Sequence, residues 1–228
     1  MKLKNHGFTL AEVLITLGVI GVVAAITMPM LIQNHQKHVT ENRLKKSFST
    51  LNQALKMSEV ENGPAKYWDL DSGGTEMENC KNTTEKYIIP YLKAEYCDSG
   101  NSNSDSAGKC AKYVNCGYAS QNYTLADGTM IGICAYGLGQ EIYITILPIK
   151  TLKKGRKFGF IVDREKGVLL PARYVAGLSR EDIKRGYEYN GEGFTVGCSK
   201  NGGATYPYHA CTALIYVDGW KIKDDYPW

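Results

Sequence analysis

The chain has 228 residues, of which 43 % are hydrophobic and 22 % are charged. This composition excludes intrinsic disorder and allows one sizeable domain, with or without an extension. The formal net charge is +4. Without Lys2 and Lys4, 25 Lys and Arg stand against 23 Asp and Glu, so the remaining charge of +2 is too small to indicate a nucleic-acid-binding protein.

The N-terminal segment combines a basic start with a long apolar run. Lys2 and Lys4 lie in residues 1–7, and the run covers residues 8–32 with few polar exceptions: Thr9, Glu12, Thr16 and Thr27. About 20 apolar residues are enough for a helix to span a bilayer. The two lysines are expected on the cytoplasmic side, which places the rest of the chain outside that membrane.

Two simpler interpretations of this segment fit less well. A secretory signal peptide has an apolar region of roughly 7–15 residues followed by a small-residue cleavage site, and residues 26–36 contain no such site. A plain single-pass anchor explains the length but not Glu12, because an acid at the centre of a membrane helix costs about 2.5–3.5 kcal/mol. The apolar run offers no Lys or Arg as its partner.

The sequence GFTLAEVLITLGVIGVVAAI, from Gly7 onward, resembles the N-terminus of type IV pilins and of the pseudopilins of type II secretion systems. In that family a prepilin peptidase cuts after the glycine and methylates the new N-terminus. The resemblance implies cleavage between Gly7 and Phe8, N-methylation of Phe8, and a role in subunit assembly for Phe8 and Glu12. It also implies a helix break at Pro29, and it covers about 25 residues.

Elementary electrostatics supports the role of Glu12 in assembly. A free α-amine has a pKa near 8 and is positive at neutral pH. In a low-dielectric setting an ammonium and a carboxylate attract strongly, and each alone is costly. Cleavage therefore creates a partner for Glu12. We expect a staggered neighbouring subunit to supply that amine, so that the carboxylate helps to set the register between subunits.

The helical pattern continues into an amphipathic segment, residues 33–62. Its apolar stripe at spacings of 4, 3 and 4 comprises Leu44, Phe48, Leu51 and Leu55. The Gly63-Pro64 pair is a stop signal, so we expect one helix from residue 8 to about 60, roughly 80 Å long at 1.5 Å per residue. We interpret the stripe as the face that docks the globular part, and Gly18 and Gly21 as sites of close helix approach.

Residues 63–228 form the expected globular head, in which we predict short strands and loops. Strands joined by Asp127-Gly128, at 141–147 and at 157–163 are the clearest. A short helix broken near Pro90 is expected in 84–96, a surface loop in 98–109 and a Ser179-capped helix in 179–189. A last strand is expected in 211–222. The predicted fold class is α+β, with the long helix packed on an antiparallel sheet, as in pilins.

All seven cysteines lie in this head, none forms C-x-x-C, and the histidines are not spaced with them as zinc ligands. Disulfides in an oxidising compartment are the better interpretation. Because the number is odd, at least one thiol is free or pairs with another chain. By analogy with pilins, Cys198–Cys211 is the favoured bridge, and Cys97–Cys110 and Cys110–Cys116 remain alternatives.

The sequence predicts no cofactor, no metal and no enzymatic activity. His35 and His38 are close in sequence, but we expect them in solvent or at the lipid headgroups. Residues 150–156 lack the acids of a pseudopilin calcium loop. Three acids near the C-terminus are compatible with calcium but need no such role: Asp218, Asp224 and Asp225.

The predicted function is therefore a structural subunit of a type IV pilus or a secretion pseudopilus. Its expected partners are the prepilin peptidase, other subunits and, before assembly, the cytoplasmic membrane, with the head outside. The alternative is a minor or tip pilin that captures DNA or a surface ligand through a small basic cluster: Lys153, Lys154, Arg156 and Lys157. We interpret that cluster as a solvated hairpin and nucleic acid as a less favoured partner.

Overall fold

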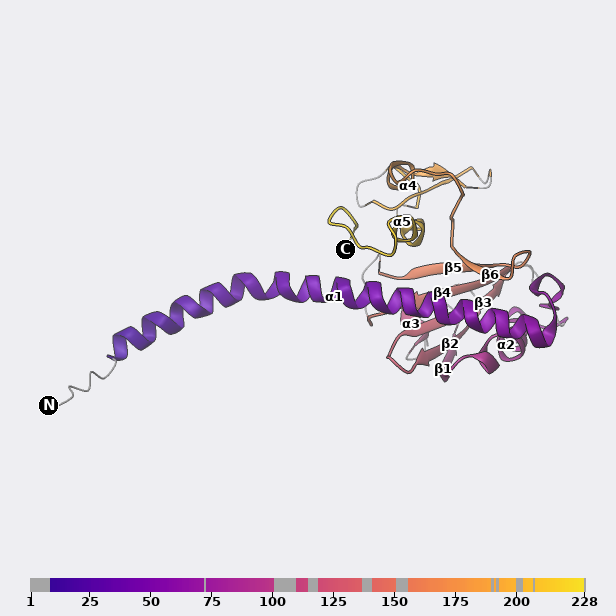
Figure 1. Ribbon diagram of the computed structural model, residues 1–228, viewed down its shortest axis with the longest axis horizontal. Helices are drawn as coiled ribbons and strands as arrows, with labels where there is room; N and C mark the ends of the chain where they lie inside the picture. The colour runs from indigo at the N-terminus through magenta and orange to yellow at the C-terminus, as the bar shows by residue number, and fades with distance from the viewer. Residues whose placement is uncertain are drawn as a thin grey trace. The chain divides into compact units, whose positions relative to one another are not determined.

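The computed structural model describes residues 9–71, 73–100, 110–114, 119–136, 141–150, 156–189, 191, 193–199, 203–206 and 208–227. The chain divides into two compact units, Met1–Val39 and Thr40–Trp228. One helix, α1 (Leu10–Asn62), runs through both (Figure 1). Its length and its end before Gly63-Pro64 confirm the predicted helix, and Gly63 has a φ of 77° that ends it.

The helix break expected at Pro29 is wrong, because Pro29 lies inside α1 and the helix continues on both sides of it. A proline removes one backbone donor from a helix and crowds the preceding turn. In α1 the turns before and after Pro29 keep their helical conformation, so that single loss is tolerated.

The second unit is built on a six-stranded antiparallel sheet, in which every strand pairs with the next one along the chain (Figure 1). Its strands are β1 (Ala94–Gly100), β2 (Ser120–Leu125), β3 (Met130–Tyr136), β4 (Glu141–Leu147), β5 (Phe158–Asp163) and β6 (Val168–Pro171). A separate pair consists of β7 (Tyr187–Glu188) and β8 (Thr195–Val196). The predicted antiparallel sheet is confirmed.

The β2–β3 hairpin shows why the sequence signal there was reliable. Gly128 has a φ of 80°, which a residue with a side chain rarely adopts, and Asp127 accepts a hydrogen bond from the Thr129 N–H at 3.0 Å. The Leu125 N–H donates to the Thr129 carbonyl at 2.8 Å. The Asp-Gly pair thus closes the turn between two strands, as predicted.

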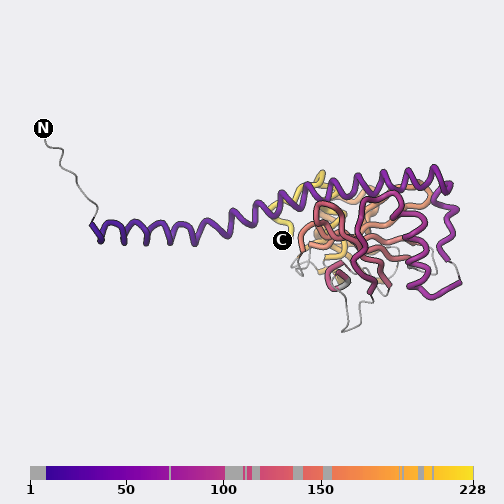
Figure 2. The backbone as a smooth tube through the Cα atoms, turned by 90° about the horizontal axis from the view of Figure 1, so that it is seen from below, coloured from indigo at the N-terminus to yellow at the C-terminus, as the bar shows by residue number. Residues whose placement is uncertain are grey.

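The core lies between one face of this sheet and the helices. Alternate strand residues such as Ile133, Ile144 and Phe158 are fully buried together with Leu51 and Leu55 of α1. Figure 2 shows the part of α1 in the second unit lying along the layer of strands. The apolar stripe therefore docks the head, as expected.

Shorter helices complete the second unit. They are α2 (Glu76–Tyr87), α3 (Ala111–Val114), α4 (Arg180–Arg185), α5 (Cys211–Val217) and two 3₁₀ turns, Ala65–Tyr67 and Ile89–Tyr91. Near α3 the chain passes so close to β3 that a Cβ on Gly132 would lie 2.1 Å from the Val114 carbonyl oxygen. Gly132 is thus required by the close approach of two backbones.

Three element predictions in the head need correction. The segment 211–222 begins with helix α5 and not a strand; its N-terminal part is buried on every side, so no alternation distinguishes strand from helix. The helix expected in 84–96 lies earlier: α2 ends at Tyr87, and Ala94–Tyr96 belong to β1. Residues 98–100 of the expected loop also belong to β1, and 101–109 lie outside the described residues.

The disulfides include the favoured bridge and one of the two alternatives. Cys198 bonds Cys211 with 4.6 Å between their Cα atoms, and Cys97 bonds Cys110 with 6.1 Å, which excludes Cys110–Cys116. Cys134 is also disulfide-bonded. Among the described cysteines Cys80 is free and buried, and burial raises the pKa of its thiol. That thiol donates to the Ile133 carbonyl, so it is a packed group and not a nucleophile.

Candidate functional site

The first part of α1 presents an unusually apolar surface. Fourteen large apolar side chains between Leu10 and Ile32 are exposed, among them Ile26 at 72 %. One 18-residue window of the helix has a mean hydropathy of 2.3, which by length and composition is enough to cross a membrane. Because its whole circumference is apolar, this segment needs lipid or other protein chains as its surroundings.

The N-terminus of this helix carries a closed set of polar contacts. Thr9 precedes the first helical residue, and both its N–H and its hydroxyl donate to Oε2 of Glu12 at 2.8 Å. In return, the Glu12 N–H donates to the Thr9 hydroxyl at 3.2 Å. This reciprocal arrangement is a capping box, which satisfies two backbone donors at the start of a helix.

The capping box fixes the position of the Glu12 carboxylate at the start of α1. The carboxylate lies in the first helical turn, where the partial positive charge of the helix end stabilises an anion. Within the described part of the chain, the Glu12 carboxylate accepts hydrogen bonds from Thr9 alone, and it accepts them through Oε2. The second oxygen, Oε1, is therefore available for a donor from outside the described residues.

Sequence reasoning identified Glu12 but missed Thr9, although the signal was present. A Thr-x-x-Glu pattern immediately before an apolar run is a capping-box signature. Gly7 and Phe8, the residues of the expected cleavage site, lie outside the described residues. Gly18 and Gly21 have no atom within 4 Å of the place where a Cβ would stand, so a second helix could approach there.

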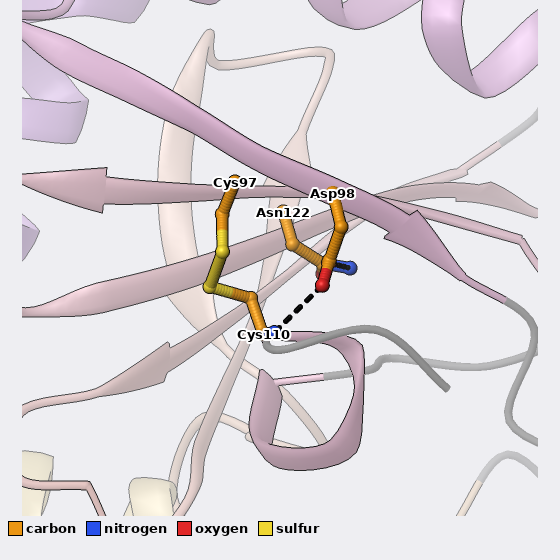
Figure 3. The surroundings of a disulfide bond; sticks show 4 residues. All are labelled: Cys97, Asp98, Cys110 and Asn122. Carbon is orange, nitrogen blue, oxygen red and sulfur yellow. Dashed lines mark hydrogen bonds between the residues drawn. A yellow bond between two sulfur atoms is a disulfide. The ribbon is translucent and has the colours of Figure 1, made fainter. Parts of the chain in front are cut away.

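The atoms that could bind a ligand at the disulfide Cys97–Cys110 are engaged within the chain. Cys97, Asp98 and Cys110 have ligand atoms within 4.8 Å of one another, but the two sulfurs are bonded to each other and cannot coordinate a metal (Figure 3). Asp98 instead accepts hydrogen bonds from the Cys110 N–H at 2.7 Å and from the Asn122 amide at 2.9 Å. The group ties β1 to β2 and to the residue before α3.

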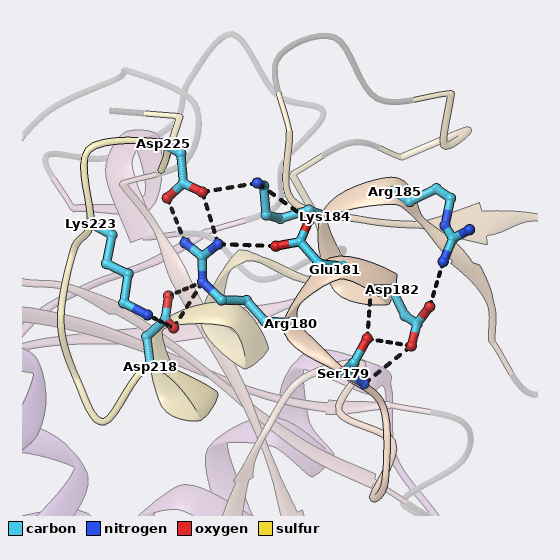
Figure 4. A network of polar contacts seen from close by, with 9 residues as sticks. All are labelled: Ser179, Arg180, Glu181, Asp182, Lys184, Arg185, Asp218, Lys223 and Asp225. Atoms are coloured by element: carbon cyan, nitrogen blue, oxygen red, sulfur yellow. Dashed lines mark hydrogen bonds and ion pairs between the residues drawn. The ribbon is translucent and has the colours of Figure 1, made fainter.

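The acids near the C-terminus are also engaged. Asp218 and Asp225 both bind the guanidinium of Arg180, which is incompatible with a calcium site made from the same oxygens (Figure 4). His35 and His38 are exposed, and the described residues bring no further metal ligand to them. These observations leave the start of α1 as the candidate site.

The basic cluster proposed for DNA binding is only partly described. Lys153 and Lys154 lie outside the described residues, whereas Arg156 is 8 % exposed and Lys157 is half-buried. Burial lowers the pKa of Lys157. Because Arg156 is buried, it is not available for the phosphates of a nucleic acid, and the solvated-hairpin interpretation does not hold for it.

Two family models match the chain. A prokaryotic N-terminal methylation motif matches residues 2–28, and a family of unknown function (DUF6613) matches residues 30–163. No curated protein and no solved structure matches the chain. The first match covers the exposed apolar helix with Thr9 and Glu12, and the second covers the amphipathic helix and the sheet as far as β5.

Proposed function

Because the chain belongs to the family of unknown function (DUF6613) and starts with a prokaryotic N-terminal methylation motif, we propose that it is a structural subunit of a type IV pilus or a type II secretion pseudopilus. That motif is characteristic of the leaders of type IV pilins and pseudopilins. The fold is pilin-like: a long apolar N-terminal helix whose second part packs on an antiparallel sheet.

The proposed maturation begins at the leader, residues 1–7. The prepilin peptidase cuts between Gly7 and Phe8, and Phe8 becomes the N-methylated first residue. Residues 8–32 then serve as membrane anchor and assembly segment, residues 33–62 as the amphipathic segment and residues 63–228 as the head. The disulfides Cys97–Cys110 and Cys198–Cys211 support a head outside the cytoplasm, because such bonds persist in oxidising compartments.

The exposed apolar surface between Leu10 and Ile32 is the observation that carries this proposal. In the membrane, lipid covers that surface; after extraction, only other copies of the same helix or of related subunits can cover it. A contact between different faces of identical chains does not close, so it propagates into a filament. This is the behaviour of a structural subunit and requires no catalytic group.

Glu12 gives the bundled helices a register. Its Oε2 is held by Thr9. In the proposed filament, Oε1 accepts a hydrogen bond from the amine of Phe8 of the adjacent subunit. In apolar surroundings a mismatched position leaves both charges unpaired, which is costly. The charge pair therefore selects one axial offset among many that apolar contacts alone would allow.

Mass spectrometry of the N-terminal peptide tests this function. The assembled protein is expected to start with N-methylated Phe8, and a Gly7→Ala variant is expected to retain residues 1–7. Gly18→Ala is the matched control: it changes a glycine of α1 where a Cβ meets no neighbour, so it should be processed normally. Residues 1–7 still attached in assembled material would refute the proposal.

A further inference from the structure

The C-terminal segment 218–226 joins two parts of the head that are far apart in the sequence. Near its two ends it contacts α4 through Asp218 and Asp225, and in its middle it contacts α1 through Lys221 and Ile222. We refer to residues 218–226 as the C-terminal strap. It follows α5 and lies outside the residues that match either family model.

On α4 the strap is held by the guanidinium of Arg180. Arg180 donates from Nε to both oxygens of Asp218 at 2.9 Å, and from its two terminal nitrogens to the two oxygens of Asp225 (Figure 4). Lys184 adds a 2.9 Å contact to Asp225 and Lys223 a 2.6 Å contact to Asp218. Two-pronged arginine–carboxylate pairs of this kind fix geometry as well as charge.

On α1 the strap is held by a buried acid. The Glu41 side chain is only 7 % exposed, and it accepts the Ile222 N–H at 2.7 Å and the Lys221 ammonium at 3.1 Å. The second unit starts at Thr40, so Glu41 is its second residue. The strap therefore contacts α1 at the first turn of the helix that belongs to the head.

Aromatic packing reinforces this contact. The Trp220 ring centroid lies 4.7 Å from that of Phe48, one of the residues of the docking stripe. Trp220 has a φ of 66°, which is unusual for a residue with a large side chain, and its N–H donates to the Ile215 carbonyl. The backbone at the end of α5 is thus bent so that the ring faces α1.

Further along α1 the sheet supplies the contacts. Asn52 accepts the Leu169 N–H at 2.9 Å and Lys56 donates to the Lys166 carbonyl at 3.0 Å, while Leu51 and Leu55 are in the core. Within the segment 40–48, Arg43 also donates to the Pro148 carbonyl at 2.8 Å, a contact that does not involve the C-terminal strap. Residues 51–62 are therefore docked by the sheet. Glu41 accepts hydrogen bonds from the strap, and the Phe48 ring packs both on Trp220 of the strap and, at 5.7 Å between centroids, on Phe160 of β5.

We propose that the C-terminal strap is a latch that keeps the segment 40–48 of α1 on the head, with Arg180 as the residue that closes it. Arg180 is a residue of α4 that binds the strap, and its effect on α1 is indirect because it is transmitted through the strap. Opening it frees the first turns of the docked helix and leaves residues 51–62 in place. This device is independent of the proposed function and concerns how the head holds its own helix.

Hydrogen exchange of the full chain in detergent micelles tests the latch. Arg180→Ala is expected to speed exchange of the backbone amides at 42–48 by roughly tenfold or more, without changing those at 53–60 or in β3 and β4. Arg185→Ala is the matched control, because this residue lies on the same helix and pairs with Asp182 at 2.7 Å but does not contact the strap. It should leave the amides at 42–48 unchanged.

Two further variants keep the test decisive. Asp225→Asn removes one charge while preserving shape, and it is used if Arg180→Ala unfolds the sheet, as faster exchange in β3 and β4 would reveal. Glu41→Ala opens the latch from its other end, so adding Arg180→Ala to it should produce little further change at 42–48. Unchanged exchange at 42–48 in every variant whose strands stay protected would overturn the proposal.

Discussion

The two parts of α1, residues 10–39 and 40–62, share one secondary structure but need different surroundings. In the first part large apolar residues such as Leu17 and Ile20 are exposed at 60 % and 63 %. In the second part Leu44 and Leu51 are fully buried against the head. A helix that is apolar on all sides takes its partner from outside the chain, whereas a helix with one apolar stripe finds its partner within the chain.

The comparison predicts that the two parts can be damaged separately. Substitutions in residues 10–39 should affect assembly without changing the stability of the head. Substitutions on the buried face of residues 40–62 should lower the stability of the head without changing cleavage of the leader.

Glu12→Ala should have the largest effect. Removing one member of a charge pair in apolar surroundings leaves the other unpaired, so we expect filament yield to fall roughly tenfold or more. Cleavage and the thermal unfolding of the head should stay unchanged. Thr16→Ala is the control, since among the residues that the structure describes the Thr16 hydroxyl donates only to the Val13 carbonyl of its own helix. Normal assembly of the Glu12→Ala variant would remove the register argument.

Leu51→Ala should destabilise the packing of residues 40–62 on the head. This side chain is fully buried, and a cavity in its place should lower the free energy of unfolding of the head by about 2–5 kcal/mol. Denaturant unfolding of the full chain in detergent measures it. Met57→Ala, on the same helix but 55 % exposed, should change that free energy by less than about 0.5 kcal/mol. Equal losses in the two variants would contradict the assignment of the docked face.

Thr9→Ala should have a smaller effect than Glu12→Ala. It removes the cap of α1, which is worth about 1 kcal/mol, and it releases Glu12 from its fixed position. We expect filament yield to fall severalfold, and Thr9→Ser, which keeps the hydroxyl, to restore it. A Thr9→Ser variant as defective as Thr9→Ala would show that the capping box is not what matters.

Protonation of Asp225 at low pH should lower the free energy of unfolding of the head only slightly. The hydrogen bonds from Arg180 and Lys184 hold the pKa of this carboxyl well below its usual range. Its contribution is therefore present above the unfolded pKa of about 3.9 and lost as pH falls towards the lower folded value. The side chain is 40 % exposed, so solvent screening limits the contribution to about 1 kcal/mol at most.

The measurement compares the free energy of unfolding of the unmodified chain and of Asp225→Asn across pH. The difference between them should be constant from pH 7 to about pH 5 and should shrink below about pH 4. A difference that grows as the pH is lowered would contradict the sign assigned to this group.

Elements of the fold were predicted correctly where the sequence pattern was long, periodic or strongly local. The 53-residue helix, the docking stripe and the Asp127-Gly128 hairpin all came from local signals that tertiary contacts did not override. Helix α5 was mistaken for a strand because seven residues rich in β-branched and aromatic types give no helical period when nearly all are buried. There the disulfide to Cys198 and the packing against β5 decide the conformation.

The candidate site was predictable only where one residue stood out. Glu12 is conspicuous because a carboxylate interrupts an apolar run, whereas Thr9 is an ordinary residue until its place at the helix start is known. The strap could not be predicted, because Glu41 and Ile222 are 181 positions apart and no local pattern links them. Long-range polar contacts of this kind need the folded chain.

Solid-state NMR of filaments assembled from two separately labelled pools measures the central contact directly. One pool carries ¹³C in the Glu12 carboxyl group and the other carries ¹⁵N at the amine of Phe8, so only contacts between different subunits give a dipolar signal. The account predicts a carbon–nitrogen distance within about 4 Å. A mixed-label filament without that coupling would contradict it, and would show that the apolar helices bundle without a charge pair between subunits.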